Sequence, residues 1–275
     1  MYLNKISCRP FLKWVGGKSQ LLPELYKRLP DSFNNYFEPF VGAGALLFSL
    51  QPKKAHISDL NLELINCYEV IRNYVDELIL DLRQHCYEKE YYYQLRNADR
   101  LDSFEQWSPI QKASRMIFLN KSCFNGLYRL NSKSQFNVPF GRYTNPTIVD
   151  ENNLKACSQL LSRTSIKKVS FLEIELDISK GDLVYFDPPY IPLNNTSNFT
   201  SYNPDGFGMN MQYELLEMCR RLHDRGIMFI LSNSSAPTVL DLYQDFRIEL
   251  VPAKRVINSK AQGRGKINEV IIRNF

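Results

Sequence analysis

The sequence places an acidic residue, two prolines and a tyrosine at the end of an apolar run. Asp187, Pro188, Pro189 and Tyr190 follow residues 183–186, which are all aliphatic or aromatic. The prolines fix the backbone angle φ and remove two N–H donors, so the turn offers carbonyl oxygens and one carboxylate. Such a turn suits an exocyclic amine, because the Asp187 carboxylate and the Pro188 carbonyl can each accept one N–H.

The tyrosine of this turn suits the face of a nucleobase. An adenine inside a duplex has its amine paired, so it must be swung out of the stack, and an aromatic side chain such as Tyr190 lowers the cost of unstacking. The amine can then attack a sulfonium methyl group without a strong base, since proximity and aligned acceptors supply the catalysis. A strand-ending turn with a solvated Asp187 is the alternative interpretation.

A second segment has the composition of a ligand-binding turn. We expect Glu38, Phe40, Gly42 and Gly44 to contact a cofactor, because glycines after a first strand let the backbone approach a ligand closely. Asp59 ends the next predicted strand, 15 residues past Gly44, where a carboxylate can accept hydrogen bonds from a ribose. A helix N-cap is the competing interpretation of Asp59.

Trp14 and Lys18 form a third candidate site near the N-terminus. The indole of Trp14 can cover a purine or a sulfonium, and Lys18 can reach a carboxylate. The Gly-Lys-Ser ending resembles a phosphate-binding loop, but that motif needs a glycine where Leu12 stands and a preceding strand, so we reject an NTPase. A buried tryptophan and a surface lysine are the alternative interpretation.

Residues 124–146 are rich in Asn, Gly, Arg and aromatic residues, which predicts a hairpin or an irregular loop. Arg129 and Asn125 carry the side chains that read guanine and adenine edges. Phe124 can wedge into the base stack beside a flipped base. An ordinary polar hairpin is the alternative interpretation of this segment.

Positive charges accompany this stretch. The chain has a net charge of +5 and a pI of about 8.8, which suits a polyanion but also many metabolic enzymes. Arg142, Lys133 and Lys121 can hold phosphates. The basic, glycine-rich segment 260–266 is either a contact to the DNA backbone or a solvated loop.

The elements that must position these residues follow an α/β order. Strand-like runs lie at 36–40, 55–58, 166–171, 183–186, 227–231, 246–251 and 267–273. Helix-like runs lie at 45–50, 212–225 and 236–243, and from Leu60 to about Cys123. The last two strands read as an antiparallel pair finishing a mostly parallel sheet. We predict a discontinuous catalytic domain of residues 1–60 and 160–275, interrupted by an insert of residues 61–159.

The composition excludes several classes of protein. A hydrophobic fraction of 44% and a charged fraction of 23% are typical of a folded domain. No apolar run approaches the ~18 residues that span a bilayer, and no signal-peptide core is visible, so we expect a cytoplasmic protein without a membrane partner. The six cysteines form no C-x-x-C pair, which predicts reduced thiols and no metal site.

Five motifs occur in one order along the chain. They are KWVGGK at 13–18, FEPFVGAG at 37–44, NGLYR at 125–129, FNVPFGRY at 136–143 and DPPY at 187–190. With these motifs the chain resembles Dam-type (DpnM-like) site-specific DNA adenine-N6 methyltransferases, which are paired with GATC restriction systems. The resemblance covers nearly the whole chain.

The resemblance implies the class I SAM-dependent methyltransferase fold. This is a mostly parallel seven-stranded sheet flanked by helices, here with an inserted, mainly helical target-recognition domain carrying a β-hairpin. The resemblance also implies S-adenosyl-L-methionine as cofactor and S-adenosyl-L-homocysteine as product. It implies that the cofactor is bound by Trp14, Lys18, Asp59 and Asp187.

The resemblance further implies a target and partners. It implies GATC in double-stranded DNA, with a cognate restriction endonuclease as a functional rather than a physical partner. Contacts to the recognition site are implied for Lys13, Leu127, Arg129, Pro139 and Tyr143.

The predicted function is therefore methyl transfer to the N6 amine of adenine in duplex DNA, by base flipping and in-line attack. An N5-glutamine or RNA methyltransferase is a rival, because a similar Pro-Pro-Tyr turn can hold an amide. The Arg129 hairpin and the segment from Trp14 to Lys18 favour DNA over that rival. A non-catalytic DNA-binding module is the second rival, and cofactor binding distinguishes it.

Overall fold

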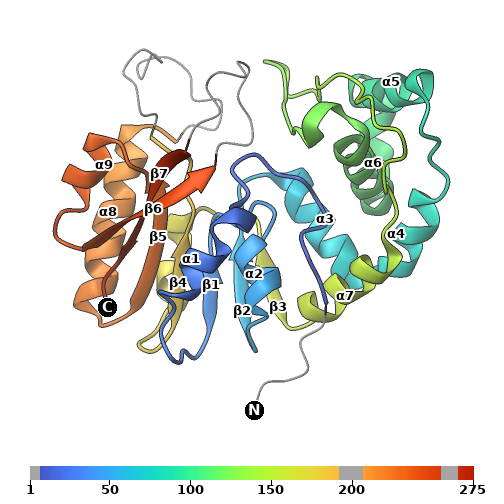
Figure 1. The fold of residues 1–275 in the computed structure, drawn as a ribbon. Coiled ribbons are helices and arrows are strands. Elements are labelled where there is room, and N and C mark those ends of the chain that lie inside the picture. The colour runs from blue at the N-terminus through green and yellow to red at the C-terminus, as the bar shows by residue number, and fades with distance from the viewer. Residues whose placement is uncertain (1–6, 192–206, 255–265) are drawn as a thin grey trace. The chain divides into compact units, whose positions relative to one another are not determined.

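Seven strands form one mixed sheet in the computed structural model of the chain, in the order β3-β2-β1-β4-β5-β7-β6 (Figure 1). The structure describes residues 7–191, 207–254 and 266–275, and the backbone alone for residues 253, 254, 266 and 267. These residues form two units, each assembled from separate segments of sequence. The first unit takes its described residues from 1–18, 42–51 and 59–168, and the second from 19–41, 52–58 and 169–275.

The second unit contains most of the sheet. Its strands are β1 (Tyr36–Glu38), β2 (Ala55–Ser58), β4 (Leu183–Phe186), β5 (Met228–Ser234), β6 (Arg247–Lys254) and β7 (Lys266–Arg273). Strand β1 pairs in parallel with β2 and β4, and β4 pairs in parallel with β5. Strand β7 runs antiparallel to both β5 and β6. All of β1 and β4 is buried, as expected for parallel strands covered on both faces.

Helices complete the core of the second unit. They are α1 (Leu22–Tyr26), α8 (Met209–Asp224) and α9 (Pro237–Leu242). One face of α8, with Leu215, Met218, Cys219 and Leu222, belongs to the same buried cluster as Phe229 of β5. The polar face of α8 stays in solvent, so its amphipathic pattern fixes which side meets the sheet.

The first unit is mainly helical. Its helices are α2 (Ala45–Leu50), α3 (Leu62–Asn73), α4 (Val75–Leu82), α5 (Lys89–Asn97), α6 (Pro109–Ser122) and α7 (Glu151–Leu161), and it contributes strand β3 (Thr164–Lys167). Helix α6 begins with a capping box formed by Ser108 and Gln111 and has a proline in its first turn, which explains why it starts there. Figure 1 shows the segment that follows α6 lying beside α5.

The predicted fold class is confirmed: the sheet is seven-stranded and mostly parallel, with helices around it. Residues 45–50, 55–58 and 183–186 form the expected elements at the expected bounds. None of the helices within the described residues is long and apolar enough to cross a membrane. The domain boundaries expected from the sequence, 1–60 with 160–275 and 61–159, stay a prediction.

Two strands differ from the prediction for local reasons. Strand β1 ends at Glu38, not at residue 40, because Pro39 has no N–H to donate to a neighbouring strand. Strand β3 covers Thr164–Lys167 instead of 166–171. A capping box formed by Ser170 and Glu173 starts a short helical turn there and ends the extended run.

Candidate active site and DNA-recognition loop

Asp187 lies at the carboxyl end of β4, where open α/β sheets place their ligands. Its Oδ1 accepts a hydrogen bond from the Ser232 hydroxyl of β5 at 2.9 Å. The same hydroxyl oxygen lies 3.0 Å from the Tyr185 hydroxyl. Because Ser232 has one proton and gives it to Asp187, Tyr185 is the donor to Ser232. A chain of two buried hydroxyls therefore orients one edge of the carboxylate.

The backbone after Asp187 is held from two sides. The carbonyl of Pro189 accepts a hydrogen bond from Gln212 Nε2 of α8 at 3.0 Å. The N–H of Ile191 donates to Asn233 Oδ1 of β5 at 3.3 Å. Both amide side chains are almost fully buried. The turn is thus fixed between a helix and a strand that come later in the sequence.

Sequence reasoning missed Ser232, Asn233 and Gln212. The first two belong to Ser232-Asn233-Ser234, a polar run directly after the apolar residues of β5. Polar residues at the carboxyl end of a buried strand are a signal of a site that the prediction did not use. Gln212 carries no comparable signal, because one polar residue near the start of a helix is ordinary.

Tyr190 and Glu38 also lie in the second unit, and each belongs to a phenol–carboxylate pair, partly buried for Tyr190 and buried for Glu38. The Tyr190 hydroxyl donates to Glu269 Oε2 of β7 at 2.9 Å. Burial raises the pKa of Tyr190, and the charges of Asp187 and Glu269 raise it further, so the ring stays a neutral phenol. The Tyr36 hydroxyl donates to Glu38 Oε2 at 2.7 Å.

Phe40 lies in the second unit, where its partly buried ring packs against the apolar core. Its ring contacts Phe171 and Phe207, with centroids 5.3 and 5.5 Å apart. A half-buried ring of this kind can border a ligand while it closes the apolar core beneath it.

The glycine turn of the first unit brings several predicted cofactor residues together. Gly42 and Gly44 have positive φ values of 47° and 66°. A Cβ atom at Gly42 would lie 2.9 Å from Trp14 Cδ1, so only glycine lets the indole lie against this backbone. The N–H of Gly42 donates to Asp59 Oδ2 at 3.2 Å. Gly42 therefore contacts both Trp14 and Asp59, and we call these three residues the glycine cradle.

Asp59 is not the cap of the following helix. The side chain of Asn61 accepts a hydrogen bond from the Leu64 N–H at 3.0 Å and caps α3. Asp59 Oδ1 instead accepts from the Asn61 N–H at 3.0 Å. Both carboxylate oxygens of Asp59 therefore accept from backbone N–H groups, and its binding of a ribose stays a prediction.

The alternative interpretation predicts a buried Trp14 and a surface Lys18, but the structure shows a buried Lys18 and a partly exposed Trp14. Lys18 is only 7% exposed, and its Nζ donates to the Gly16 carbonyl at 2.5 Å. Trp14 is partly exposed, and its ring stacks on Tyr128 with centroids 5.1 Å apart. The fixed ammonium group of Lys18 suits an anion. The partly exposed indole of Trp14 suits a flat or cationic ligand.

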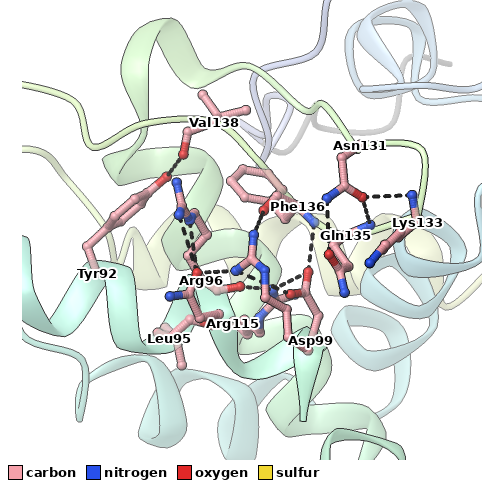
Figure 2. Close-up of polar contacts among 12 residues, drawn as sticks. Tyr92, Leu95, Arg96, Asp99, Arg115, Asn131, Lys133, Gln135, Phe136 and Val138 are labelled. Carbon is pink, nitrogen blue, oxygen red and sulfur yellow. Dashed lines mark hydrogen bonds and ion pairs between the residues drawn. The ribbon is translucent and has the colours of Figure 1, made fainter.

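A short loop between Arg129 and Val138 carries part of the predicted DNA contacts, and we call it the recognition loop. Isolated antiparallel bridges join Leu130 to Phe136 and, just outside the loop, Cys123 to Phe140. Its tip is organised by one side chain, Asn131, whose Oδ1 accepts from the N–H groups of Lys133 and Gln135 at 2.9 and 3.0 Å (Figure 2). The predicted hairpin is thus a tight loop rather than a pair of continuous strands.

Side chains of α5, α6 and the turn between them anchor the recognition loop (Figure 2). The Phe136 N–H donates to Asp99 Oδ2 at 2.7 Å, and the same oxygen pairs with Arg115 Nη2 at 2.8 Å. The Tyr92 hydroxyl donates to the Val138 carbonyl at 2.8 Å. Arg115 is 1% exposed, so a fully buried guanidinium supports the loop from beneath.

The predicted base-reading residues lie at the surface of the first unit. Arg129 donates from Nε to Asn137 Oδ1 at 2.7 Å and from Nη2 to the Asn137 carbonyl at 3.1 Å, which holds its guanidinium in one place. Asn125 has a positive φ of 56° and its neighbour Phe124 is 52% exposed. The exposed DNA candidates are Lys13, Phe124, Asn125, Arg129, Pro139 and Arg142.

Lys13 and Tyr143 form a contact on the same unit. Lys13 Nζ donates to the Tyr143 hydroxyl at 3.3 Å. A Cβ atom at Gly126 would lie 2.2 Å from the Lys13 side chain, which explains the glycine there. Burial lowers the pKa of Lys121, and the charge of Lys13 lowers it further.

Leu127 and the segment 260–266 give less structural support for a DNA contact. Leu127 packs with the buried cluster around Phe118, and its carbonyl accepts from the Cys123 thiol at 3.2 Å. Of the basic segment 260–266, residues 260–265 lie outside the described residues. Among the residues that are described, no group of three His, Cys, Asp or Glu side chains is placed to share a metal ion.

The predicted cofactor residues divide between the two units. Glu38, Phe40 and Asp187 belong to the second unit, and Trp14, Lys18, Gly42, Gly44 and Asp59 to the first. Each group is preorganised within its own unit by the contacts above.

Comparison with known proteins identifies the class of enzyme. The family of D12 class N6 adenine-specific DNA methyltransferases matches residues 14–257 of this chain. The chain belongs to this family, and it is therefore an adenine-specific DNA methyltransferase.

Relatives from bacteria and an archaeon extend over nearly the full length. The chain is 47% identical to the type II methyltransferase M1.LlaDCHI of Lactococcus lactis subsp. cremoris, over 99% of this chain and 97% of the relative. It is 43% identical to the type II methyltransferase M.MjaIII of Methanocaldococcus jannaschii, over 97% and 99%. It is 31% identical to a DNA adenine methylase of Serratia marcescens, over 96% and 97%.

Proposed function

We propose that the chain methylates the N6 amine of adenine within GATC in double-stranded DNA, using S-adenosyl-L-methionine and a base swung out of the duplex. The observation that carries this proposal is the Asp187 turn. It supplies the Asp187 carboxylate and the Pro188 carbonyl as acceptors, and it is fixed by Ser232, Gln212 and Asn233. Preorganised acceptors of this kind favour an amine nitrogen whose positive charge develops as it reacts.

The glycine cradle fits the proposed cofactor. S-adenosyl-L-methionine, when bound, supplies a methyl group on a positively charged sulfur, which the adenine amine attacks in line. A Cβ atom at Gly42 would clash with Trp14 and one at Gly44 with Tyr68, so this turn requires glycine at both positions. Asp59 can accept from ribose hydroxyls, and Lys18 can hold the methionine carboxylate. S-adenosyl-L-homocysteine is the product under this proposal.

Asp187 has two tasks in the proposed reaction. Its carboxylate and the Pro188 carbonyl accept the two N6–H bonds, which aims the nitrogen lone pair away from the turn. Tyr190, a neutral phenol held by Glu269, stacks on the face of the adenine. After transfer the surplus proton leaves the nitrogen, so no strong base is required in the turn.

Target recognition is assigned to the first unit. Arg129 presents the donor fork that suits a guanine edge, and Asn125 the amide that suits an adenine edge. Lys13, Leu127, Pro139 and Tyr143 complete the proposed contacts to the site, with Arg142 on a phosphate and Phe124 as the wedge that replaces the flipped base. GATC itself rests on the family resemblance that the five ordered motifs carry.

A place in a restriction–modification system is part of this proposal. Two relatives are named as type II methyltransferases, which supports a cognate GATC restriction endonuclease as a functional partner. The reaction on DNA places the enzyme in the cytoplasm of a bacterial cell, whether a chromosome or a phage encodes it.

Methylation of defined duplexes tests the proposal. Purified protein and radiolabelled cofactor are incubated with matched duplexes that contain GATC or a site with one base pair changed, and the nucleosides are separated. We expect N6-methyladenine in the GATC duplex alone. Methylcytosine, or no methylated duplex, would refute the proposal, and methylation of matched RNA or of a glutamine-containing peptide would favour the rival methyltransferases.

Two further measurements test the parts of the proposal. A fluorescent 2-aminopurine in place of the target adenine should brighten when the protein and cofactor bind, because the base leaves the stack. Calorimetry with S-adenosyl-L-homocysteine tests the glycine cradle. An absence of binding would support a non-catalytic DNA-binding module.

A further inference from the structure

Glu63, on α3, lies outside the proposed active site and contacts two side chains at once. Its Oε2 accepts a hydrogen bond from the Tyr128 hydroxyl at 2.7 Å. Its Oε1 lies 3.5 Å from Arg115 Nη1. Burial raises the pKa of the Tyr128 phenol and the Glu63 charge raises it further, so Tyr128 remains the donor. One carboxylate therefore ties an aromatic side chain to a buried cation.

The Arg115 side of this tie leads to the recognition loop. Arg115 Nε donates to the Leu95 carbonyl at 2.9 Å and Nη2 to the Arg96 carbonyl at 2.8 Å. Its ion pair with Asp99 joins it to the N–H of Phe136 (Figure 2). With so many fixed partners, the guanidinium cannot shift towards one neighbour without loosening another.

The Tyr128 side leads to the glycine cradle. The ring of Tyr128 stacks on Trp14 with an interplanar angle of 22°. Trp14 in turn lies against Gly42, whose N–H is bound to Asp59. All of these residues belong to the first unit. The contacts thus form an unbroken series from the recognition loop to the residues proposed to hold the cofactor.

We propose that Glu63 and Arg115 are positioning residues that couple target recognition to cofactor binding. Engagement of the recognition loop by the correct site stabilises the existing Asp99–Arg115 pair, and through Glu63 this holds Tyr128 and Trp14 more firmly at the cradle. By reciprocity, bound cofactor favours the recognition loop in its reading position. This inference rests on the proposed function, since it names the two ligands assigned there.

Two dissociation constants for each protein measure the coupling. The affinity for S-adenosyl-L-homocysteine is measured by calorimetry without DNA and with a saturating GATC duplex, and the ratio is the coupling factor. In the wild-type protein we expect a factor of at least about fivefold, the lower end of ordinary allosteric coupling. In Glu63→Gln, which keeps the shape but removes the charge facing Arg115, we expect the factor to fall towards one.

Two variants make the measurement specific. Tyr128→Phe keeps the stacked ring but removes the hydroxyl that Glu63 accepts from, so it should also lower the factor. If Glu63→Gln does not fold, the coupling factor of Tyr128→Phe tests the proposal by itself. Glu105→Gln is the matched control, because the Glu105 side chain is 88% exposed and lies outside the series. It should keep the wild-type factor.

The outcomes separate this inference from the proposed function. Wild-type protein that methylates GATC but shows no coupling, or variants that keep the full coupling factor, would overturn the inference and leave the proposed function standing. Wild-type protein that methylates no duplex would overturn the proposed function first. A lowered factor in both variants, with wild-type melting temperatures, supports the role of Glu63 and Arg115.

Discussion

The Asp187 turn and the recognition loop are both irregular segments, but they are held in different ways. The turn contains two prolines and joins directly onto a buried strand, so much of its shape is covalent and local. The recognition loop has little regular structure and depends on Asp99, Arg115 and Tyr92 from other elements. The difference teaches that prolines restrict the turn locally before Ser232, Gln212 and Asn233 complete its support, whereas the recognition loop depends mainly on side chains from other elements.

Removal of the carboxylate from the turn should have the largest effect on catalysis. We expect Asp187→Ala to lower kcat by about 10³-fold, the size of effect seen when one preorganised polar group is lost from an active site. DNA affinity, measured by gel shift, should stay near the wild-type value. Asp31→Ala, at an exposed position of the same unit, is the control. Near-normal turnover in Asp187→Ala would show that the turn is not the reacting corner.

Removal of the support beneath the recognition loop should act on stability instead. Asp99→Ala leaves the buried Arg115 without its closest counter-charge, so we expect a loss of about 3 kcal/mol in the free energy of unfolding. Denaturant titration measures this. The exposed neighbour Asp102, changed to Ala, should cost far less. Equal stability of the two variants would contradict the remote support inferred for the loop.

A change at the surface of the loop should affect specificity without affecting the fold. We expect Arg129→Ala to lose about 2 kcal/mol of discrimination, or roughly 30-fold, between GATC and a site changed at one guanine. Lys133→Ala is the contrast, because a phosphate contact weakens binding to all duplexes alike. Comparison of kcat/KM on both duplexes measures the effect. An unchanged ratio in Arg129→Ala would remove Arg129 from base reading.

The hydroxyl chain behind Asp187 should contribute less than the carboxylate itself. Ser232→Ala removes one hydrogen bond to Oδ1, so we expect about 1 kcal/mol, or roughly a fivefold loss of kcat, with little change in KM for DNA. Single-turnover rates measure this. Ser162→Ala, an exposed serine, serves as control. A loss as large as that of Asp187→Ala would show that the turn depends on remote support as much as the loop does.

The smallest effect is expected from His85, which supports the helices beneath the recognition loop. Its ring nitrogens lie 2.7 and 2.9 Å from the hydroxyls of Tyr91 and Ser114, and burial lowers the pKa of His85. The unfolded chain then binds more protons than the folded one just below the usual histidine pKa of 6.5, so stability should decrease as the pH falls through that range. His85→Gln should flatten this part of the pH dependence of unfolding. An unaltered pH dependence of the unfolding free energy in His85→Gln would show that His85 does not cause it.

The sequence alone determined the features that depend on short stretches of chain. The Pro-Pro turn after residues 183–186, the helix 45–50 behind the glycines and the alternation of strands and helices follow from local backbone chemistry and from the period of apolar residues. The ordered motifs also sufficed for the family. The predicted bounds erred at β1 and β3 because a proline or a capping box lies nearby, and β5 and β6 each run three residues further than predicted.

Only the tertiary structure decided which distant side chains meet. The contact between Ser232 and Asp187 spans 45 residues of sequence, and that between Asp99 and Phe136 spans 37. The contacts of Glu63 with Arg115 and Tyr128 span at least 52. Neither residue type nor spacing reveals such contacts, because they depend on how whole strands and helices pack. A sequence therefore specifies the groups that can do the chemistry, and packing decides which partners hold them still.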